Sequence, residues 1–486
     1  MKLNNIYYII KYMRKRLQFI GGDIINLDIL IENCTVITMD KMRRVLKNTC
    51  IGVIGDKIVY LGDFNDNLNA VKVIKGSSML AVPGLIDSHA HSGHGLLKNV
   101  EECVMNRKII DLYPNLFYEY TTQKFWFSEA MLSGIEKLKF GITTGVSFLG
   151  SHMRFDELVY AEAHVEGMLG VGIRDIMCLS PPNPPYPKRF SKWNDMQMLD
   201  TNQLLLEDSI NYIEMAVKRF NRVNSEFTFC YPSTSFIGNG NENSTEETKI
   251  YKFIKNLADE YGTYIHSHSY KGEIKYVYEN FKFYNEKVFI SNCNDISSEE
   301  IKILSDLGVS YCISPFLEMQ SMRYSPVVKL LNEGVNTTLC TEVNNSDCTF
   351  DLFEKARMRV LMGRSYSNNN YAIQPDKALE MITINAAKAL GLDNMIGSIE
   401  IGKKADITLI DIEKPHLYPL WQNPINLIYQ VSGHDVDTVI VDGRVLMEKR
   451  ILTQLNEKKI LNSAQNEAQK VLLREGVKEY LELLTV

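Results

Sequence analysis

The chain has 486 residues, of which 45% are hydrophobic and 23% charged, and its formal net charge is −6. This balance is typical of a folded globular protein, and the length fits a barrel domain plus a smaller second domain. The acidic charge and the lack of a long basic stretch argue against nucleic acid as a partner, because phosphate binding needs clustered Lys and Arg. No apolar run approaches the ~18 residues of a membrane span, so we expect no membrane partner either.

The nine cysteines are scattered and contain no Cys-x-x-Cys pair. An odd number without paired spacing indicates neither a disulfide framework nor a thiolate zinc cage, so we expect a cytoplasmic protein. The first residues are basic and aromatic, and Lys11, Arg14, Lys15 and Arg16 interrupt their apolar stretch. A secretory signal needs an unbroken apolar segment, and we therefore expect residues 1–27 to be an N-terminal extension.

Strand-rich blocks stand near both ends of the chain. Residues 28–39 are rich in Ile, Leu, Val and Thr, and residues 51–61 predict a β-hairpin with its turn at Gly55-Asp56. Residues 405–411 and 437–446 show a similar strand-forming pattern. The two blocks are alike although they are far apart, and we expect them to form one small composite β-sandwich domain.

Between these blocks, short apolar strands alternate with longer helical patterns. One example is a strand over 142–149 followed by a helix over 155–169, and another is a strand over 335–341 followed by a helix over 350–363. Such alternation predicts βαβ units with a parallel sheet. Since the interval has room for eight units, we expect an α/β fold with a distorted (β/α)₈ TIM barrel. A doubly wound open sheet is the structural alternative.

Two pairs of histidines stand at the ends of apolar strands. His89 and His91 end the segment Pro83-Gly-Leu-Ile-Asp-Ser-His-Ala-His, and His266 and His268 end a second apolar strand. Side chains two residues apart in a strand point to the same side, and the carboxyl ends of barrel strands hold the active site. Neutral imidazoles in that position can bind a divalent metal. The alternative interpretation is two unrelated pairs of hydrogen-bonded histidines.

Several segments carry a family resemblance. They include Val82-Pro-Gly-Leu-Ile-Asp-Ser-His-Ala-His, Leu138-Lys-Phe-Gly-Ile-Thr-Thr-Gly and Ile396-Gly-Ser-Ile-Glu-Ile-Gly-Lys-Lys-Ala-Asp. Through them the chain resembles the amidohydrolase superfamily, and most of all the branch that holds triazine hydrolases, cytosine and guanine deaminases and adenosylhomocysteine deaminases. The resemblance covers about residues 28–465. It implies deamination or amide hydrolysis of a small, cyclic nitrogen compound by a metal-activated water.

The chain departs from the family pattern at three polar positions of the site. Lys271 stands where the family has a Glu proton shuttle, Asn292 replaces a His, and Glu342 replaces an Asp. Glu342 keeps a carboxylate, which can bind metal or activate water. Lys271 can act as a base of lowered pKa or grip an acidic substrate, whereas Asn292 can only hydrogen-bond. A solvated lysine at the start of a helix is the alternative for Lys271.

Together these residues form one candidate site. We expect one divalent metal, zinc first and iron as the alternative, held by His89, His91, His268 and Glu342. The expected catalytic residues are Glu342, Lys271 and Asn292. The expected substrate-binding residues are His94, His152 and Glu273, the last as a replacement for the missing carboxylate. His266 could be an alternative ligand, but crowding favours a supporting role.

The resulting hypothesis is a metal-dependent hydrolase that acts on the C–N bond of a small molecule. The alternative is a barrel that has lost catalysis and binds a ligand or partner; a metal-dependent lyase or isomerase is a third option. We expect a homodimer, and four parts of the chain beyond the extension: residues 28–80 and 396–450 in the composite domain, 81–395 in the barrel, and 451–486 in a C-terminal helical segment.

Overall fold

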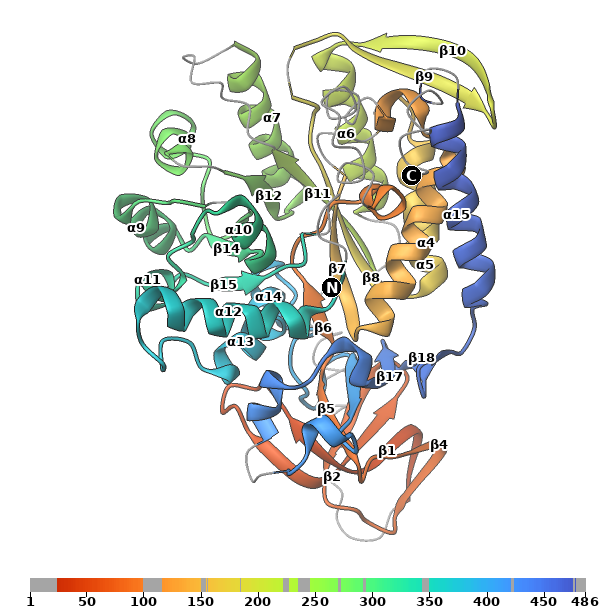
Figure 1. The fold of residues 1–486 in the computed structure, drawn as a ribbon, viewed down its shortest axis with the longest axis vertical. Coiled ribbons are helices and arrows are strands. Elements are labelled where there is room, and N and C mark those ends of the chain that lie inside the picture. The colour runs from red at the N-terminus through yellow and green to blue at the C-terminus, as the bar shows by residue number, and fades with distance from the viewer. Residues whose placement is uncertain are drawn as a thin grey trace, which may run out of the picture.

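The computed structural model describes residues 24–98, 116–149, 154, 156–183, 185–221, 227–234, 245–269, 272–291, 294–342, 349–420, 424–474 and 477. A barrel surrounded by helices forms its upper part, and a separate sheet lies below it (Figure 1). Most of the expected N-terminal extension lies outside the described residues. The first strand already begins at Ile25, within the last residues of that extension.

Eight strands form the central sheet, in the order β15-β14-β13-β12-β11-β8-β7-β6. They are β6 (Leu85–Asp87), β7 (Ile142–Phe148), β8 (Arg174–Leu179), β11 (Thr228–Thr234), β12 (Ile265–His268), β13 (Val288–Ser291), β14 (Ser310–Ile313) and β15 (Thr337–Leu339). All neighbouring strands in this order pair in parallel. The strands follow one another in chain order without the reversal of a doubly wound sheet, so the predicted (β/α)₈ barrel is confirmed.

Helices cover the outside of the barrel (Figure 1). Their apolar residues face the strands; in α9, for example, Ile301 and Leu304 are buried, and Ser297 and Glu300 form a capping box at its start. The helices are α4 (Gln123–Lys139), α5 (Val159–Val171), α6 (Leu206–Phe220), α7 (Thr245–Tyr261), α8 (Glu273–Phe281), α9 (Ser298–Leu307), α10 (Pro315–Ser321), α11 (Val327–Asn332), α12 (Leu352–Ser367), α13 (Pro375–Met381) and α14 (Ile384–Ala389). Short 3₁₀ helices are η1 (His94–Leu97), η2 (Pro415–Leu417), η3 (Pro424–Tyr429) and η4 (Gly433–Asp435).

The barrel is joined differently between its first and last strands. Among the described residues, β6 and β15 share no ladder of backbone hydrogen bonds. Instead, Ser88 Oγ donates to the Leu339 carbonyl at 3.0 Å and lies 2.7 Å from Thr338 Oγ1. The N–H of Glu342 donates to the carbonyl of His89 at 3.0 Å. We call this junction of β6, β15 and the residues that follow each strand the seam.

Both ends of the chain contribute to the second, nine-stranded sheet. Its order is β19-β18-β17-β16-β5-β1-β2-β3, with β4 paired to β1. The strands are β1 (Ile25–Ile37), β2 (Val45–Ile54), β3 (Lys57–Gly62), β4 (Leu68–Lys75), β5 (Met79–Pro83), β16 (Ile407–Asp411), β17 (Val436–Val441), β18 (Arg444–Glu448) and β19 (Ile451–Leu452). The predicted hairpin forms between β2 and β3, and Gly55 supplies its positive φ of 57°. The antiparallel pairing of β5 with β16 joins the two halves, which confirms the expected composite sheet.

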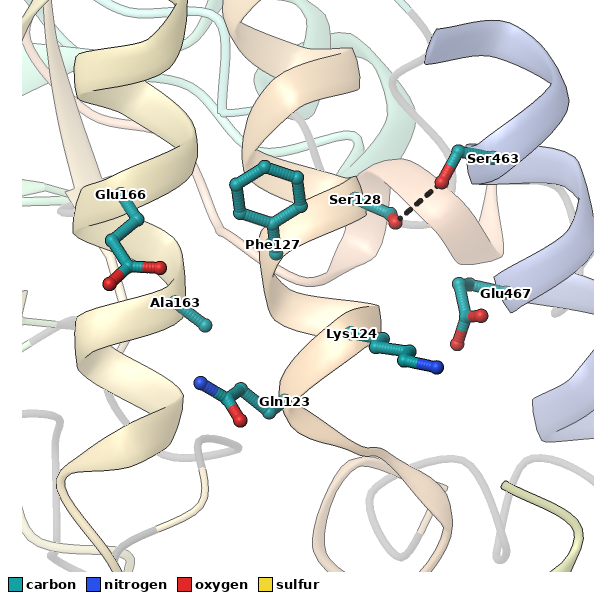
Figure 2. A pocket seen from close by; sticks show the side chains of 8 residues that line it. All are labelled: Gln123, Lys124, Phe127, Ser128, Ala163, Glu166, Ser463 and Glu467. Carbon is teal, nitrogen blue, oxygen red and sulfur yellow. Dashed lines mark hydrogen bonds between the residues drawn. The ribbon is translucent and has the colours of Figure 1, made fainter. Parts of the chain in front are cut away.

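Two further features lie at the edge of the barrel. A hairpin of β9 (Lys188–Asn194) and β10 (Gln197–Leu204), which the sequence analysis did not predict, projects at the top of Figure 1. Helix α15 (Glu457–Leu473) follows the composite sheet and packs on α4. Figure 2 shows a surface pocket over α4, α5 and α15, where Ser128 and Ser463 are hydrogen-bonded at 3.1 Å. None of the predicted site residues lines this pocket.

Two expectations about the chain as a whole concern membranes and disulfides. Within the described ranges, no helix combines the length and the apolar character needed to cross a bilayer. Six cysteines of these ranges carry free thiols, and all six are buried.

A buried ion pair connects the barrel to the composite sheet. The guanidinium of Arg174, in the first position of β8, contacts the carboxylate of Asp406, just before β16, and both side chains are almost fully buried. Its other arm lies 3.5 Å from Asp442, which also pairs with Lys404 at 3.1 Å. The relative position of the two sheets therefore depends on charged groups with little access to water.

We predict that Arg174→Ala destabilises the protein by about 3–5 kcal/mol, because it leaves the Asp406 carboxylate buried without its cation. The measurement is urea or thermal unfolding. As a control, Arg219→Ala removes an exposed ion pair with Glu162 and should cost less than about 1 kcal/mol. Equal losses in the two variants would contradict this account of the junction.

Candidate metal centre

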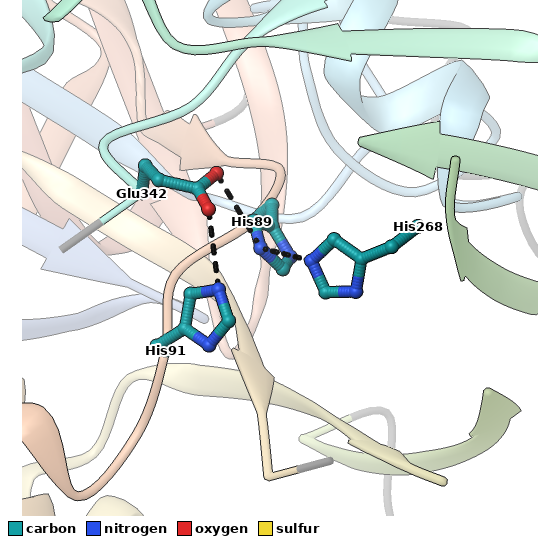
Figure 3. A group of neighbouring side chains, drawn as sticks. All are labelled: His89, His91, His268 and Glu342. Carbon is teal, nitrogen blue, oxygen red and sulfur yellow. Dashed lines mark hydrogen bonds and ion pairs between the residues drawn. The ribbon is translucent and has the colours of Figure 1, made fainter. Parts of the chain in front are cut away.

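Four side chains converge at the carboxyl ends of the barrel strands. His89, His91, His268 and Glu342 each offer one ligand atom, and these atoms all lie within 4.8 Å of one another. The imidazoles and the carboxylate point toward a common centre (Figure 3). His91 Nε2 lies 3.1 Å from Glu342 Oε1, His89 Nε2 lies 3.5 Å from Glu342 Oε2, and the Nε2 atoms of His89 and His268 are 3.2 Å apart.

Three strands bring these four residues together. His89 and His91 follow β6, and the backbone at His91 bridges to Phe148 at the end of β7. His268 is the last residue of β12. Glu342 follows β15 after two residues and lies across the seam from His89. The predicted convergence of imidazoles from two separate strands is therefore present, and the carboxylate joins them from a third.

Glu342 adopts a conformation that is uncommon for a residue other than glycine. Its φ is +59°, in the left-handed region, and its N–H donates to the carbonyl of His89 at 3.0 Å. Left-handed non-glycine residues store strain and are concentrated at functional sites. The conformation turns the carboxylate toward His89 and His91, so local strain and site geometry have the same origin.

The charge states of these residues suit metal binding. Burial lowers the pKa of His91 and His268, and for His268 the neighbouring imidazoles lower it well below its usual range. Burial alone would raise the pKa of Glu342, but the facing His89 and His91 outweigh it and hold that pKa well below its usual range. Neutral imidazole nitrogens and an ionised carboxylate are the forms that bind a metal.

The donor set fits one divalent cation. Three imidazoles and one carboxylate form a combination of nitrogen and oxygen ligands typical of zinc sites. The side chains of His89 and Glu342 are at most 1% exposed, whereas His91 is 16% exposed, so the cluster is reached from the side of His91. A cation at the common centre would compensate the charge of the buried Glu342 carboxylate.

His266 stands behind the cluster. Its ring stacks on that of His89 at a centroid distance of 4.7 Å and an interplanar angle of 7°. Nδ1 lies 2.9 Å from Ser233 Oγ and Nε2 lies 3.0 Å from Ser291 Oγ, so both ring nitrogens are engaged by hydroxyls of neighbouring strands. Burial, together with the adjacent imidazoles, lowers its pKa well below the usual range. These contacts agree with the supporting role expected from the sequence.

Two residues of the site were not identified from the sequence. The ring of Phe148 packs among the imidazoles, with its centroid 4.5 Å from His268 and 5.2 Å from His91. Asp87, fully buried, accepts hydrogen bonds from the N–H and the hydroxyl of Thr341, the residue before Glu342. The available signal for Asp87 was an acidic residue inside an apolar strand, two positions before a ligand.

The remaining predicted site residues have different positions. His94, in η1, is buried between the rings of His91, at 5.3 Å, and Phe117, at 4.9 Å. Glu273 opens α8, outside the cluster, and its charge contributes to the raised pKa of Tyr251 in α7, behind the larger effect of burial. Lys271, Asn292 and His152 lie outside the described residues.

Three other histidines make structural contacts away from the cluster. His164 Nε2 lies 3.1 Å from Asp175 Oδ2, and both residues are buried between α5 and β8. His416 Nε2 lies 3.1 Å from Asp435 Oδ2 near the composite sheet. His434 packs against the ring of Phe140.

The family of the chain follows from a match to a sequence profile. The profile of the amidohydrolase family matches residues 80–446, which include the barrel and part of the composite sheet. The chain belongs to the amidohydrolase family. The resemblance that the sequence motifs indicated is thereby confirmed.

This amidohydrolase is similar to enzymes named for deamination. A 5-methylthioadenosine/S-adenosylhomocysteine deaminase of Thermoanaerobacter pseudethanolicus is 29% identical over 455 residues, covering 92% of this chain and 100% of that protein. A 5'-deoxyadenosine deaminase of Methanosarcina acetivorans is 27% identical, covering 92% of this chain and 99% of that protein.

Solved structures show the same fold. A zinc-bound adenosine deaminase from Xanthomonas campestris superposes on the amidohydrolase with a TM-score of 0.78 at 18% identity, covering 93% of this chain and 99% of that one. Atrazine chlorohydrolase from Arthrobacter aurescens TC1, complexed with zinc, gives a TM-score of 0.73 at 19% identity, covering 90% and 100%.

We predict that the metal-free amidohydrolase loses stability as the pH falls below about 6.5, the ordinary histidine value. His266 has a lowered pKa in the folded state, so the unfolded chain binds its proton first, and each such group contributes at most about 1.4 kcal/mol per pH unit. Urea unfolding between pH 7.5 and 5.5 measures the slope. His266→Gln should make the slope shallower, and an unchanged slope would contradict the prediction.

Proposed function

We propose that this amidohydrolase is a metal-dependent deaminase that hydrolyses a C–N bond of an adenosine-like compound. The observation that carries the proposal is the group of four ligand atoms within 4.8 Å at the carboxyl ends of the strands. Support for the substrate class comes from full-length relatives that are named for deaminating adenosine derivatives. Hydrolysis of a C–N bond is the reaction for which these relatives are named. The adenosine-like substrate is our own inference for this chain.

His89, His91, His268 and Glu342 are proposed to hold the cation, and we propose zinc because the donor set suits it and related folds contain it. A divalent cation there would supply Lewis-acid activation of water. The residues of the chain have separate tasks. Phe148 and the stacked His266 exclude water behind the imidazoles and fix their planes. Glu342 places Oε1 and Oε2 beside two ligand nitrogens, where either oxygen can ligate the cation or accept a proton.

His94 is proposed to contact substrate, because it lies beside His91, the most exposed member of the cluster. Lys271 and Asn292 are proposed from the sequence to act in catalysis, and His152 and Glu273 to bind substrate. Lys271 matters most, since a general acid or base contributes about 10²–10⁴ in rate and a Glu is usual at its position.

A second candidate is a barrel that binds a ligand without turning it over. It is favoured by the three replacements, Lys271, Asn292 and Glu342, at working positions of the family pattern. The two candidates differ in one measurable property, the release of ammonia. The homodimer, the cytoplasmic location and the domain boundaries stay predictions of the sequence.

We predict that the purified protein binds one equivalent of zinc and that His89→Ala abolishes this binding, because it removes one of four ligands. Elemental analysis after dialysis against trace metal measures the stoichiometry. His416→Ala, on a histidine near the composite sheet, is the matched control and should retain the metal. A metal-free wild-type protein, or a His89→Ala variant that keeps its metal, would overturn the proposed ligand set.

We predict that the zinc-loaded protein releases ammonia from at least one adenosine derivative. The panel contains adenosine, 5-methylthioadenosine, S-adenosylhomocysteine and 5'-deoxyadenosine, with pyrimidines, pterins and triazines as further classes. Lys271→Glu restores the usual carboxylate, and we expect it to raise deamination of adenosine derivatives by up to about 10²–10⁴-fold. Metal binding without ammonia release in either protein would favour the binding candidate.

A further inference from the structure

A buried carboxylate adds two hydrogen bonds across the seam. Asp87 Oδ1 accepts the N–H of Thr341 at 2.9 Å, and Asp87 Oδ2 accepts the Thr341 hydroxyl at 2.6 Å. The N–H of His89 lies 3.5 Å from Oδ1 on the other side. Both Asp87 and Thr341 are completely buried, so water does not compete for these hydrogen bonds.

These contacts connect two segments that carry ligands. Asp87 comes two residues before His89, and Thr341 comes one residue before Glu342. Because no backbone ladder joins β6 to β15 in the described part of the chain, Asp87 does what a ladder does elsewhere in the barrel. The left-handed backbone of Glu342 needs such support, since a strained conformation persists only where its surroundings fix it.

Both carboxylate oxygens of Asp87 accept a hydrogen bond from Thr341. One oxygen binds the backbone and the other binds the side chain of the same residue, so Thr341 can neither rotate nor slide along the seam. Asp87→Ala removes both acceptors, whereas an amide could still accept the N–H and donate to the Thr341 hydroxyl. Burial raises the pKa of Asp87, and the charge of the buried Lys137 of α4 together with the hydrogen bonds from Thr341 opposes that rise.

We propose that Asp87 is a positioning residue of the metal centre, which fixes Thr341 so that Glu342 and His89 face each other at ligand distance. The inference rests on the proposed metal site but concerns a residue that touches neither metal nor substrate. Partners that orient metal ligands typically account for about 10–100-fold in metal affinity.

We predict that Asp87→Ala raises the zinc dissociation constant about 10–100-fold, because it removes both acceptors of Thr341. Chelator competition measures the affinity, and the visible spectrum of the Co²⁺-substituted protein reports the ligand geometry. Thr341→Val removes only the hydroxyl and should shift both readouts in the same direction by less. Thr341→Ser keeps the hydroxyl and should preserve wild-type affinity and spectrum.

The matched control is Asp175→Ala, which alters another buried barrel aspartate, bonded to Ser147 and His164 instead of to the seam. Its zinc affinity should equal that of the wild-type protein. Wild-type affinity and spectrum in Asp87→Ala and Thr341→Val would overturn this inference alone, as would equal weakening by Asp175→Ala. Absence of zinc from the wild-type protein would overturn the proposed function as well. If Asp87→Ala fails to fold, the comparison of Thr341→Val with Thr341→Ser decides.

Discussion

The closure of the barrel between its first and last strands is the constraint on which the site depends. Seven strand pairings are ordinary parallel ladders, whereas the eighth junction consists of side-chain contacts and one backbone hydrogen bond. Two of the four cluster residues, His89 and Glu342, lie at this junction. A ladder would fix their strands but would leave the following residues free, while contacts beyond the strand ends hold the side chains of the cluster.

Burial of the Glu342 carboxylate increases the attraction of the cluster for a cation. A carboxylate removed from water is costly unless a positive group compensates it, and burial disfavours the charged form of the neighbouring His91 and His268. The stacked ring of His266 and the face of Phe148 exclude solvent that could relieve this cost. The same desolvation that keeps the imidazoles neutral therefore increases the attraction for a cation, so packing and electrostatics act in one direction.

Periodicity and spacing predicted the features that depend on local sequence. The barrel, the composite sheet and the pairing of His89 and His91 with His268 follow from alternation of strands and helices and from histidines at strand ends. The contacts of Asp87 with Thr341 join residues 254 positions apart, and no local pattern encodes them. Glu273 stands at the start of α8, and its expected role in place of the missing carboxylate stays a prediction. The β9–β10 hairpin was missed because its exposed strand lacks the apolar alternation of a half-buried one.

The pairing of β5 with β16 affects how the chain folds while it is being synthesised. Met79 pairs with Asp411. After Met79 has been synthesised, 332 further residues must therefore be added before its partner in the sheet is present. At about 5–20 residues per second, this delay lasts on the order of tens of seconds. During that time the apolar edge of β5 is open to other chains and to chaperones. The emergence of β16, and not that of the first strands, sets the moment at which this part of the molecule can mature.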